Sequence, residues 1–186
     1  MFLHNPERAL HDAAPQGRDL LAEACGALEE ATARGLCGGW GIASWTPHCL
    51  PALVDGAAPR PSVLMVRAGL LAGIATLDAA DALARQWNLS RDAVWGMSPF
   101  GGNTHDPVWE AVDPRMFLNG PTDDISRFAA AFRAAFSLPR TGAVAVGTDR
   151  PAHVRELVNV LRCEPDEEKL LRYGQLLRER AERQPV

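Results

Sequence analysis

Lysine and tyrosine are almost missing from this sequence of 186 residues. Lys169 and Tyr173 are the single examples of the two residue types, although the chain carries 18 arginines. Enzymes that need a side chain to donate a proton or attack a substrate often use one of these two residues. A mechanism that needs a lysine or a tyrosine therefore has only these two candidates. Both fall in the segment expected to form the last helix, away from the strand ends.

Long apolar runs, an excess of positive charge and clustered cysteines are missing too. No apolar stretch approaches the length that crosses a bilayer. The net charge of −4 argues against a nucleic-acid backbone as the main partner. Cys25, Cys37, Cys49 and Cys163 lie far apart, which predicts reduced thiols in a cytoplasmic protein. We therefore expect neither a membrane nor a nucleic acid as a partner.

Several catalytic motifs do not occur in the sequence. It contains no Walker loop, no G-x-G-x-x-G and no G-x-S-x-G elbow. His48-Cys49, His105-Asp106 and His153 supply side chains that can bind metals, but none of them has C-x-x-C or H-E-x-x-H spacing. We therefore predict no metal site.

Short apolar runs alternate with amphipathic helical patterns along the whole chain. With 47% apolar and 23% charged residues, the chain can form one domain over residues 1–186. The alternation predicts an α/β fold, a parallel sheet covered by helices. Right-handed crossovers permit an open doubly wound sheet or an arc of a β/α barrel, and five strands are too few to close an eight-stranded barrel. We expect the strands at Met1–His4, Gly38–Ser44, Ser62–Ala68, Ala93–Pro99 and Gly142–Val146.

Helical periodicity marks the segments between these strands. Asp78 is placed to cap one helix, and Pro121–Asp124 is typical of the start of another. Phe100–Leu118 contains glycines and prolines and has no helical period, so we expect a long loop of the kind that is more often functional than idle. The helices are predicted over Arg18–Arg34 and Leu77–Trp87, from Pro121 and Pro151, and over about Asp166–Arg180.

His4 is the first candidate for chemistry. It ends the first predicted strand, and β/α proteins place catalytic groups at the carboxyl ends of their strands. A histidine there can polarise a carbonyl group or transfer a proton near neutral pH. The alternative is a strand-end histidine bonded to a neighbouring carbonyl. Arg67, within an apolar strand, either ends the buried stretch or lies in a polar pocket open to a substrate anion.

Two later loops are candidates for binding phosphate. In Ser98–Asn103, backbone amides freed by two glycines can bind phosphate oxygens, although the glycines can equally serve a turn. Gly147–Pro151 precedes a helix, whose first amides together with Arg150 and Arg155 can bind an anion. The alternative there is a helix cap at Thr148 or Asp149 with solvated arginines.

Four stretches, taken in order, resemble the C-terminal portion of the aldo-keto reductase family. They are F-L-H-N-P-E at Phe2–Glu7, G-G-W-G-I-A-S-W at Gly38–Trp45, W-G-M-S-P-F-G-G at Trp95–Gly102, and A-V-A-V-G-T-D-R-P-A-H-V-R-E-L at Ala143–Leu157. The family is a (β/α)₈ TIM-type barrel that reduces aldehydes and ketones with NADPH. The resemblance implies a partial barrel of five parallel strands with helices and a C-terminal helix.

The resemblance also implies roles for individual residues. His4 matches the active-site histidine on the family's fourth strand. The positions that match the cofactor site fall into three groups: Ala43 and Ser44 at the nicotinamide carboxamide, Ser98 and Gly101 at the pyrophosphate, and Gly147, Thr148, Asp149, Arg150 and Arg155 around the adenosine phosphate.

The family's catalytic Asp, Tyr and Lys come from strands before its fourth, so this sequence corresponds to a truncated barrel with open sheet edges. We expect an oxidoreductase portion, using NADP and a small carbonyl or sugar-like substrate, that is active when the missing strands come from upstream in the gene or from a partner. One alternative is a cofactor-free binding or assembly protein whose edges pair in a homodimer or with a complementary chain. It is motivated by Ala68 and Leu157, which replace a stacking aromatic residue and an asparagine. The other is an enzyme that uses His4 and Arg67 for non-redox proton transfer.

Overall fold

Five short parallel strands form one sheet in the computed structural model, which describes residues 1–10, 16–54 and 58–183. The strands follow the chain order across the sheet, from β1 to β5. Each lies inside a segment that the sequence predicts to be extended, so the α/β fold with five parallel strands is confirmed. Their bounds are β1 Phe2–His4, β2 Gly41–Ser44, β3 Val63–Arg67, β4 Val94–Met97 and β5 Ala143–Ala145.

The register of the first three strands brings their carboxyl ends to one edge. Phe2 pairs with Gly41, and Gly41 pairs with Val63; two residues further on, His4, Ala43 and Met65 are aligned in the same way. Because side chains alternate between the two faces of a strand, His4, Ala43 and Met65 lie on one face.

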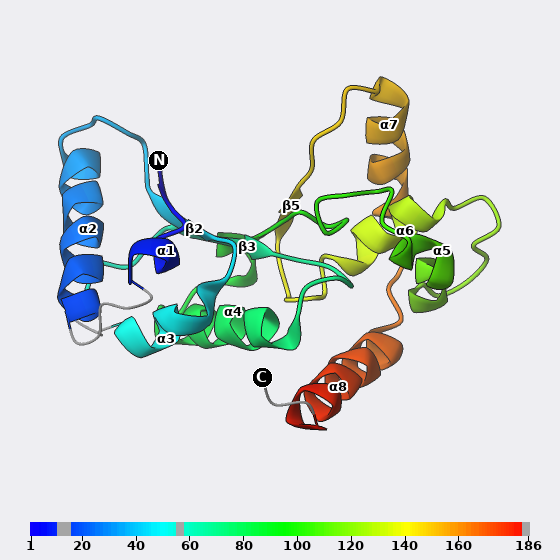
Figure 1. Ribbon diagram of the computed structural model, residues 1–186. Coiled ribbons are helices and arrows are strands. Elements are labelled where there is room, and N and C mark those ends of the chain that lie inside the picture. Colours follow the sequence, from blue (N-terminus) through cyan, green and yellow to red (C-terminus); the bar gives the residue numbers. More distant parts are fainter. Residues whose placement is uncertain (11–15, 55–57, 184–186) are drawn as a thin grey trace. The chain divides into compact units, whose positions relative to one another are not determined.

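The chain divides into two compact units, which are described here one at a time. Unit 1 comprises Met1–Arg67 and Ala75–Trp95, and unit 2 comprises Ala68–Ile74 and Gly96–Val186. The helices of unit 1, seen in Figure 1, are α1 Glu7–Leu10, α2 Gln16–Ala33, α3 Leu50–Leu53 and α4 Ile74–Gln86, with short 3₁₀ turns η1 Pro47–Cys49 and η2 Arg91–Ala93.

Large aliphatic side chains fill the core of unit 1. Leu64 and Val66 of β3 are fully buried, whereas their neighbours along the strand are half-buried, so one face of β3 is turned toward the helices. Ile42 of β2 and Leu83 of α4 meet them in one cluster. The remaining buried members of the cluster are Leu10, Leu21, Cys25, Trp40, Leu50, Leu53, Ala80 and Trp87.

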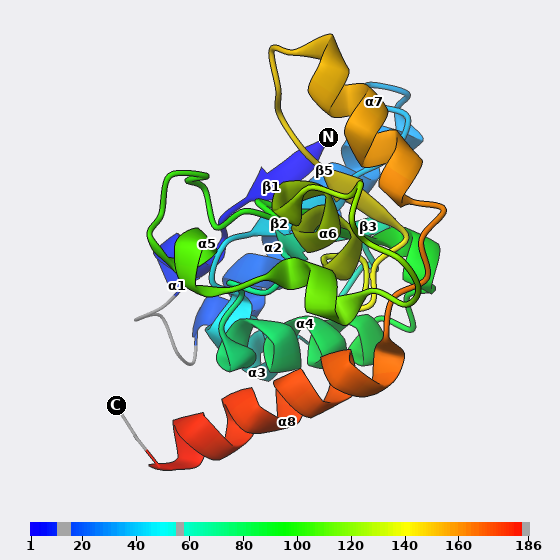
Figure 2. The same ribbon diagram turned by 90° about the vertical axis from the view of Figure 1, so that its right-hand side faces the viewer.

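Unit 2 is built around α6. Its helices are α5 Val108–Ala111, α6 Arg127–Ala134, α7 Pro151–Val160 and α8 Glu167–Arg183, with η3 Pro114–Phe117; α6, α7 and α8 are visible in Figure 2. Phe132 and the alanines of α6 pack with Leu157 and Val160 of α7. The Tyr173 hydroxyl donates to the Leu70 carbonyl at 2.6 Å, which fixes α8 within this unit.

Three local predictions were wrong. Helix α4 begins at Ile74, one turn before the expected start, so Asp78 is an exposed residue inside the helix and does not cap it. Helix α6 begins at Arg127, because the Ser126 side chain accepts from the Ala129 amide at 3.1 Å and forms the cap; Pro121–Asp124 lies in the turns before it. The segment Phe100–Leu118 is not all loop, since α5 and η3 form within it.

No helix among the described residues is both long enough and apolar enough to cross a membrane.

Candidate functional site

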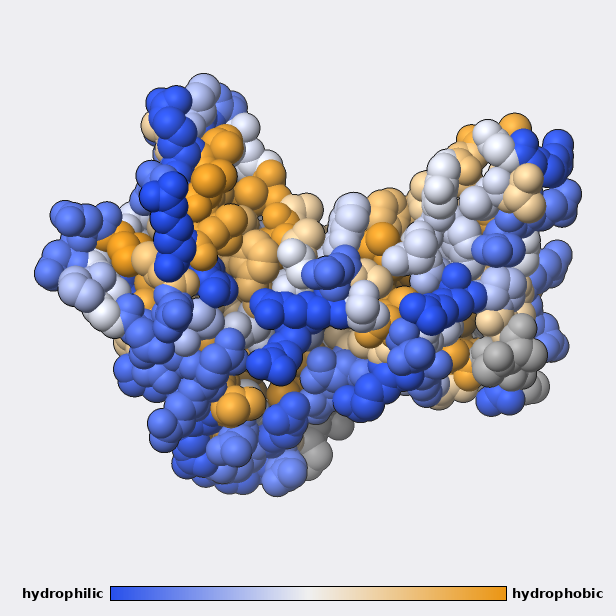
Figure 3. All heavy atoms as spheres, turned by 180° about the vertical axis from the view of Figure 1, so that it is seen from behind, coloured by the Kyte–Doolittle hydropathy of each residue, from blue (hydrophilic) through white to orange (hydrophobic). Residues whose placement is uncertain are grey.

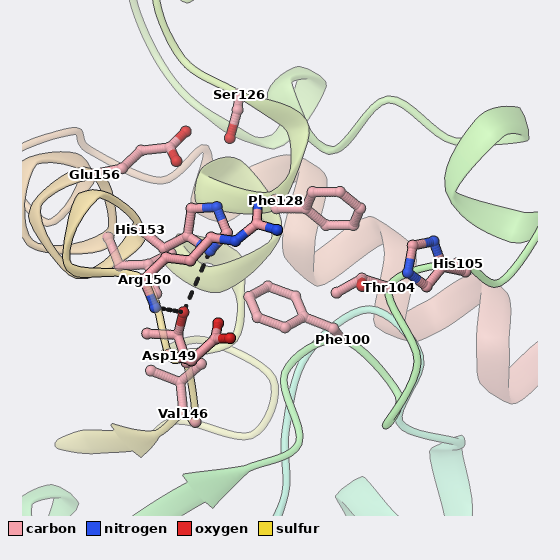
Figure 4. Close-up of a pocket in the computed structure, with 13 residues that line it drawn as sticks. Phe100, Thr104, His105, Ser126, Phe128, Val146, Asp149, Arg150, His153 and Glu156 are labelled. Atoms are coloured by element: carbon pink, nitrogen blue, oxygen red, sulfur yellow. Dashed lines mark hydrogen bonds between the residues drawn. The ribbon is translucent and has the colours of Figure 1, made fainter.

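A cavity of about 570 Å³ lies in unit 2, where the segments after β4 and β5 meet the start of α7 (Figure 4). It is enclosed by one aromatic wall and one polar wall, which come from segments far apart in the sequence. Its lining residues are Phe100, Thr104, His105, Ser126, Phe128, Val146, Gly147, Thr148, Asp149, Arg150, His153, Glu156 and Leu157. Four of the predicted cofactor residues, Gly147 to Arg150, are therefore brought together here.

The segment after β4 lines a second cavity of about 350 Å³. Ser98, Gly102 and Asn103 line it, and it shares Phe100, Thr104, Val146 and Gly147 with the first, so the two cavities adjoin. Ser98, Gly101 and Gly102 have φ values of 54°, 71° and 89°. Left-handed residues of this kind turn successive backbone N–H groups toward one side, which is how loops bind anions. A Cβ on Gly101 would lie 2.8 Å from Leu71 Cδ1, so the Leu71 side chain would have to shift, and the positive φ of Gly101 strains any other residue there.

The segment after β5 arranges the polar wall of the first cavity. The Thr148 hydroxyl oxygen accepts from the Arg150 amide at 3.2 Å and lies 3.3 Å from His153 Nδ1. The N-cap of α7 is Arg150 and not Thr148 or Asp149, so the alternative of a cap at either of those residues was wrong. Figure 4 shows the Arg150 side chain reaching into the cavity. A helix N-terminus with an adjacent arginine is suited to an anion such as phosphate.

Phenyl rings form the opposite wall of this cavity. Phe100 and Phe128 meet edge to face with their centroids 5.8 Å apart, and Trp109 packs on Phe128 in the same manner. The flat, apolar faces of such rings can pack against the base of a nucleotide. Phe128 belongs to α6, and the sequence gives no signal for its place in this wall.

Unit 1 carries the other candidate residues at the carboxyl ends of its strands. His4 lies at the end of β1, as predicted from the sequence, and the structure shows that it is exposed. The turn after it is held by side chains: Asn5 Oδ1 and Glu7 Oε1 both accept from the Trp45 amide at 3.0 Å, and Glu7 Oε1 accepts from Thr46 as well. These bonds fix the backbone after β2.

Ala43 and Ser44 lie inside unit 1 and are closed to solvent. Their exposed fractions are 4% and 0%, and the Ser44 hydroxyl has no hydrogen-bond partner within the described part of the chain. Arg155 is exposed on α7 and is not one of the residues that line the two cavities. Thus the structure gathers Gly147 to Arg150 around one cavity and places Ser98 at its neighbour. Ala43, Ser44, Gly101 and Arg155 line neither of them.

The remaining reactive side chains have structural roles. Arg67 lies over the ring of Trp45, with its guanidinium carbon 4.9 Å from the ring centroid. Lys169 pairs with Asp166 at 2.8 Å, and burial raises the pKa of Tyr173, which donates to Leu70. The lysine and the tyrosine thus lie on α8 with partners of their own.

The described residues give little structural support for a metal site or a reactive thiol. Within them, no group of three or more His, Cys, Asp or Glu side chains is placed to hold a metal ion. The four cysteines are free, and burial raises the pKa of the Cys25 thiol to about 11, which makes it a poor nucleophile.

No protein-family model matches the sequence, and no curated protein matches it either. Among solved structures, the chain superimposes on an aldo/keto reductase from Brucella melitensis with a TM-score of 0.59 and 15% sequence identity. The fold of this chain resembles that of an aldo/keto reductase. The match covers 92% of this chain and 59% of the other, so the chain spans somewhat more than half of the length of that reductase.

Unit 2 has features that favour a dinucleotide and one position that does not. In unit 2, adjoining cavities combine a left-handed turn, a helix N-terminus, an arginine and aromatic rings, which suits the phosphates and the base of a dinucleotide. Leu157, which is 7% exposed, adds an apolar patch to the lining. Ala68 is 2% exposed, and a Cβ on Gly96 would lie 2.6 Å from the Ala68 methyl group. Alanine has no ring, so position 68 cannot stack on a nicotinamide.

Proposed function

We propose that this chain is the C-terminal part of an NADP-dependent oxidoreductase of the aldo-keto reductase type. It would interconvert a small carbonyl compound, or a sugar-like one, and the corresponding alcohol in the cytoplasm. The observation that carries this proposal is the meeting of the segments after β4 and β5 at a cavity that opens onto the N-terminus of α7. The overall similarity to a reductase fold supports it.

The residues of unit 2 would bind the dinucleotide. The Gly101 amide donates to the Ser98 carbonyl at 3.0 Å, so the other backbone amides of the turn from Ser98 to Gly102 would hold the pyrophosphate. Thr148, Arg150 and the amide of Ala152 would hold the phosphate on the adenosine ribose, because Pro151 has no N–H and the His153 amide donates to the Arg150 carbonyl. The base would lie against Phe100 or Phe128. When bound, NADPH supplies the hydride for the reaction.

The residues of unit 1 would act on the carbonyl group. His4, exposed at the end of β1, would donate an N–H hydrogen bond to the carbonyl oxygen and so stabilise negative charge that develops there. Asn5 and Glu7 would keep the adjacent backbone in place. A second donor would come from the barrel strands that a further polypeptide supplies, either upstream in the same gene or in a complementary chain that pairs with β1 and β5.

NADPH binding tests the proposal directly. The Arg150→Ala variant should bind NADPH about tenfold more weakly, because it removes a charge-assisted hydrogen bond to phosphate. Arg162→Ala is the matched control, since Arg162 is exposed in unit 2 and does not line either cavity. Affinity is measured from NADPH fluorescence, for this chain and for the chain extended by any polypeptide encoded upstream. If neither form binds NADPH or reduces a carbonyl compound, the proposal is wrong.

A cofactor-free binding or assembly protein is the second candidate. It is favoured by Ala68 and by an apolar stripe along α7 and its C-cap, formed by Val154, Val158 and Leu161, which are 48%, 57% and 43% exposed. Figure 3 shows apolar atoms beside charged ones over this helix, at the upper left. In this case a second copy covers the stripe, and light scattering would show a dimer without affinity for NADPH. A monomer that binds NADPH would exclude this candidate.

A further inference from the structure

Three neighbouring strands of unit 1 end in side chains that lie on one face of the sheet. His4 ends β1, Trp45 directly follows β2, and Arg67 ends β3. Ala43 is aligned with both His4 and Met65. Trp45 and Arg67 come two residues further along β2 and β3, and residues two apart point to the same face of a strand. The three side chains therefore lie on the face of the sheet opposite the helices of the core.

Arg67 and Trp45 contact each other in a way that is compatible with binding a ligand. The guanidinium carbon of Arg67 lies 4.9 Å from the centroid of the Trp45 ring. Stacking of this kind uses the flat face of the guanidinium, whereas its N–H groups lie in the plane and form the fork that matches a carboxylate. Arg67 is half-buried, and Trp45 is 39% exposed. A carboxylate at the edge of this guanidinium would meet a partly desolvated charge beside an apolar surface, where charge-assisted hydrogen bonds are strong.

The turn after His4 holds Trp45 in place. Asn5 has a φ of 48°, a left-handed conformation that asparagine tolerates better than most residues. Its amide donates to the Ala43 carbonyl at 2.6 Å, and its Oδ1 accepts from the Trp45 amide at 3.0 Å. Glu7, which is 4% exposed, accepts from the same amide of Trp45. A binding surface that is fixed in advance loses little conformational entropy when a ligand binds.

The order of the three side chains indicates the shape of a ligand. Neighbouring strands lie about 4.8 Å apart, and each residue advances about 3.3 Å along a strand. His4 and Arg67 are two strands and two residues apart, so their Cα atoms are roughly 12 Å from each other. Side chains stand nearly perpendicular to a sheet, so a ligand that reaches both needs its two polar groups at opposite ends of a ring-sized body. Trp45 lies on the strand between them.

We infer that Arg67 binds a carboxylate at the end of the substrate remote from the carbonyl group that His4 contacts, while Trp45 packs against the body between the two groups. The inference rests on the proposed function through the role of His4, and it narrows the substrate class to carbonyl compounds that carry a carboxylate. An arginine fork binds both oxygens of a carboxylate. A neutral group of the same shape lacks the charge, so an uncharged analogue is expected to bind more weakly.

Two aldehydes of the same shape serve as probes. Para-formylbenzoate carries its carbonyl group and its carboxylate at opposite ends of a ring, and para-formylbenzamide has an uncharged amide in place of the carboxylate. Their affinities for the 186-residue chain are measured by isothermal titration calorimetry. The benzoate is expected to bind roughly tenfold more tightly than the benzamide, because only the benzoate forms charge-assisted hydrogen bonds with a guanidinium.

Four variants locate the site. Arg67→Gln removes the charge and keeps a planar end group, so it should bind the benzoate about as weakly as the benzamide. Arg67→Lys keeps the charge without the fork and should retain part of the preference. Trp45→Leu removes the ring and should weaken the binding of both probes. Arg85→Gln is the matched control, because Arg85 is exposed on α4, which packs against the other face of the sheet. Circular dichroism shows whether each variant is folded.

The outcomes separate the inference from the proposed function. Equal affinities of the unmodified protein for the two probes overturn the inference, as does a preference that survives in Arg67→Gln or is lost in Arg85→Gln. Failure of both probes to bind overturns it too. None of these results bears on the binding of NADPH, which tests the proposed function separately. A preference that depends on Arg67, in a protein that does not bind NADPH, would support the carboxylate site and reject the proposed function.

Discussion

The strand ends of the two units look alike in the sequence and differ in the structure. Each is a short apolar strand followed by small or polar residues. In unit 1 all four residues of β2 are buried, and Ser44 is 0% exposed. In unit 2, β5 is half-buried to exposed, and the residues after it, Gly147 to Arg150, are all exposed. The residues after β5 can therefore contact a ligand directly, whereas Ala43 and Ser44 are buried and cannot.

The two interiors differ as well. Unit 1 is filled by large aliphatic side chains such as Ile42 and Leu64, both fully buried. Unit 2 uses alanines along α6 with Phe132 among them. Removing a large side chain leaves a larger cavity than removing a small one, so the stability of unit 1 should depend more strongly on single residues.

Leu64→Ala tests the dense core of unit 1 and has the largest expected effect. The substitution should lower the free energy of unfolding by about 3 kcal/mol, because Leu64 is 0% exposed and the space it leaves stays empty. Leu171→Ala is the control in unit 2, where Leu171 is 68% exposed, and should change the free energy by about 0.5 kcal/mol or less. Urea denaturation measures both. Equal losses would contradict the argument that Leu64 fills the core of unit 1.

Glycines provide a second matched pair. A Cβ on Gly41 would lie 2.5 Å from the Val63 carbonyl oxygen and 2.8 Å from the Phe2 ring, so Gly41→Ala must displace β3 or Phe2. A loss of about 2–3 kcal/mol is expected from this overpacking. The Cβ of Gly147→Ala meets no atom of the described residues within 4 Å, and stability should be nearly unchanged. A thermal melt in which both variants unfold together with the parent protein would refute the packing argument for β2.

The buried thiol of Cys25 should make the stability of unit 1 depend on pH. Burial raises the pKa of its thiol from 9.0 to about 11 in the folded protein. Above pH 9 the unfolded chain releases this proton and the folded chain keeps it, so stability is complete below pH 9 and falls as the pH rises to 11. The loss amounts to about 2 kcal/mol. Urea midpoints at pH 8 to 11 should show a shallower decline for Cys25→Ala than for Cys163→Ala, and parallel declines would argue against burial as the cause.

Ser126 gives the smallest effect and tests the corrected start of α6. Ser126→Ala removes the side chain that accepts from the Ala129 amide and should cost about 1 kcal/mol. Asp124→Ala, at the start expected from the sequence, should change stability by only a few tenths of a kcal/mol, because Asp124 is exposed before the helix. Denaturation midpoints compare the two variants. A larger loss of stability in Asp124→Ala than in Ser126→Ala would support the helix start predicted from the sequence.

Periodicity located all five strands because buried parallel strands are continuous apolar runs, which differ clearly from the amphipathic helical patterns between them. Helix starts were less accurate. Asp78 and Asp124 are residues typical of caps, yet Ile74 begins α4 and Ser126 caps α6, since a cap is decided by which side chain meets a free amide in space. Nothing in the sequence indicated that Phe128 and His153 line the same cavity.

The sequence by itself determined the order of the strands and helices, the histidine at the end of β1, and the polar segment before α7. These follow from local chemistry: the alternation of apolar residues, the conformational limits of glycine and proline, and the free amides at a helix start. The tertiary structure decided which of these groups meet. It buried Ser44, turned Arg150 into a cavity with Phe100 and His153, and left Arg155 outside, because burial and contact depend on how segments distant in the chain pack together.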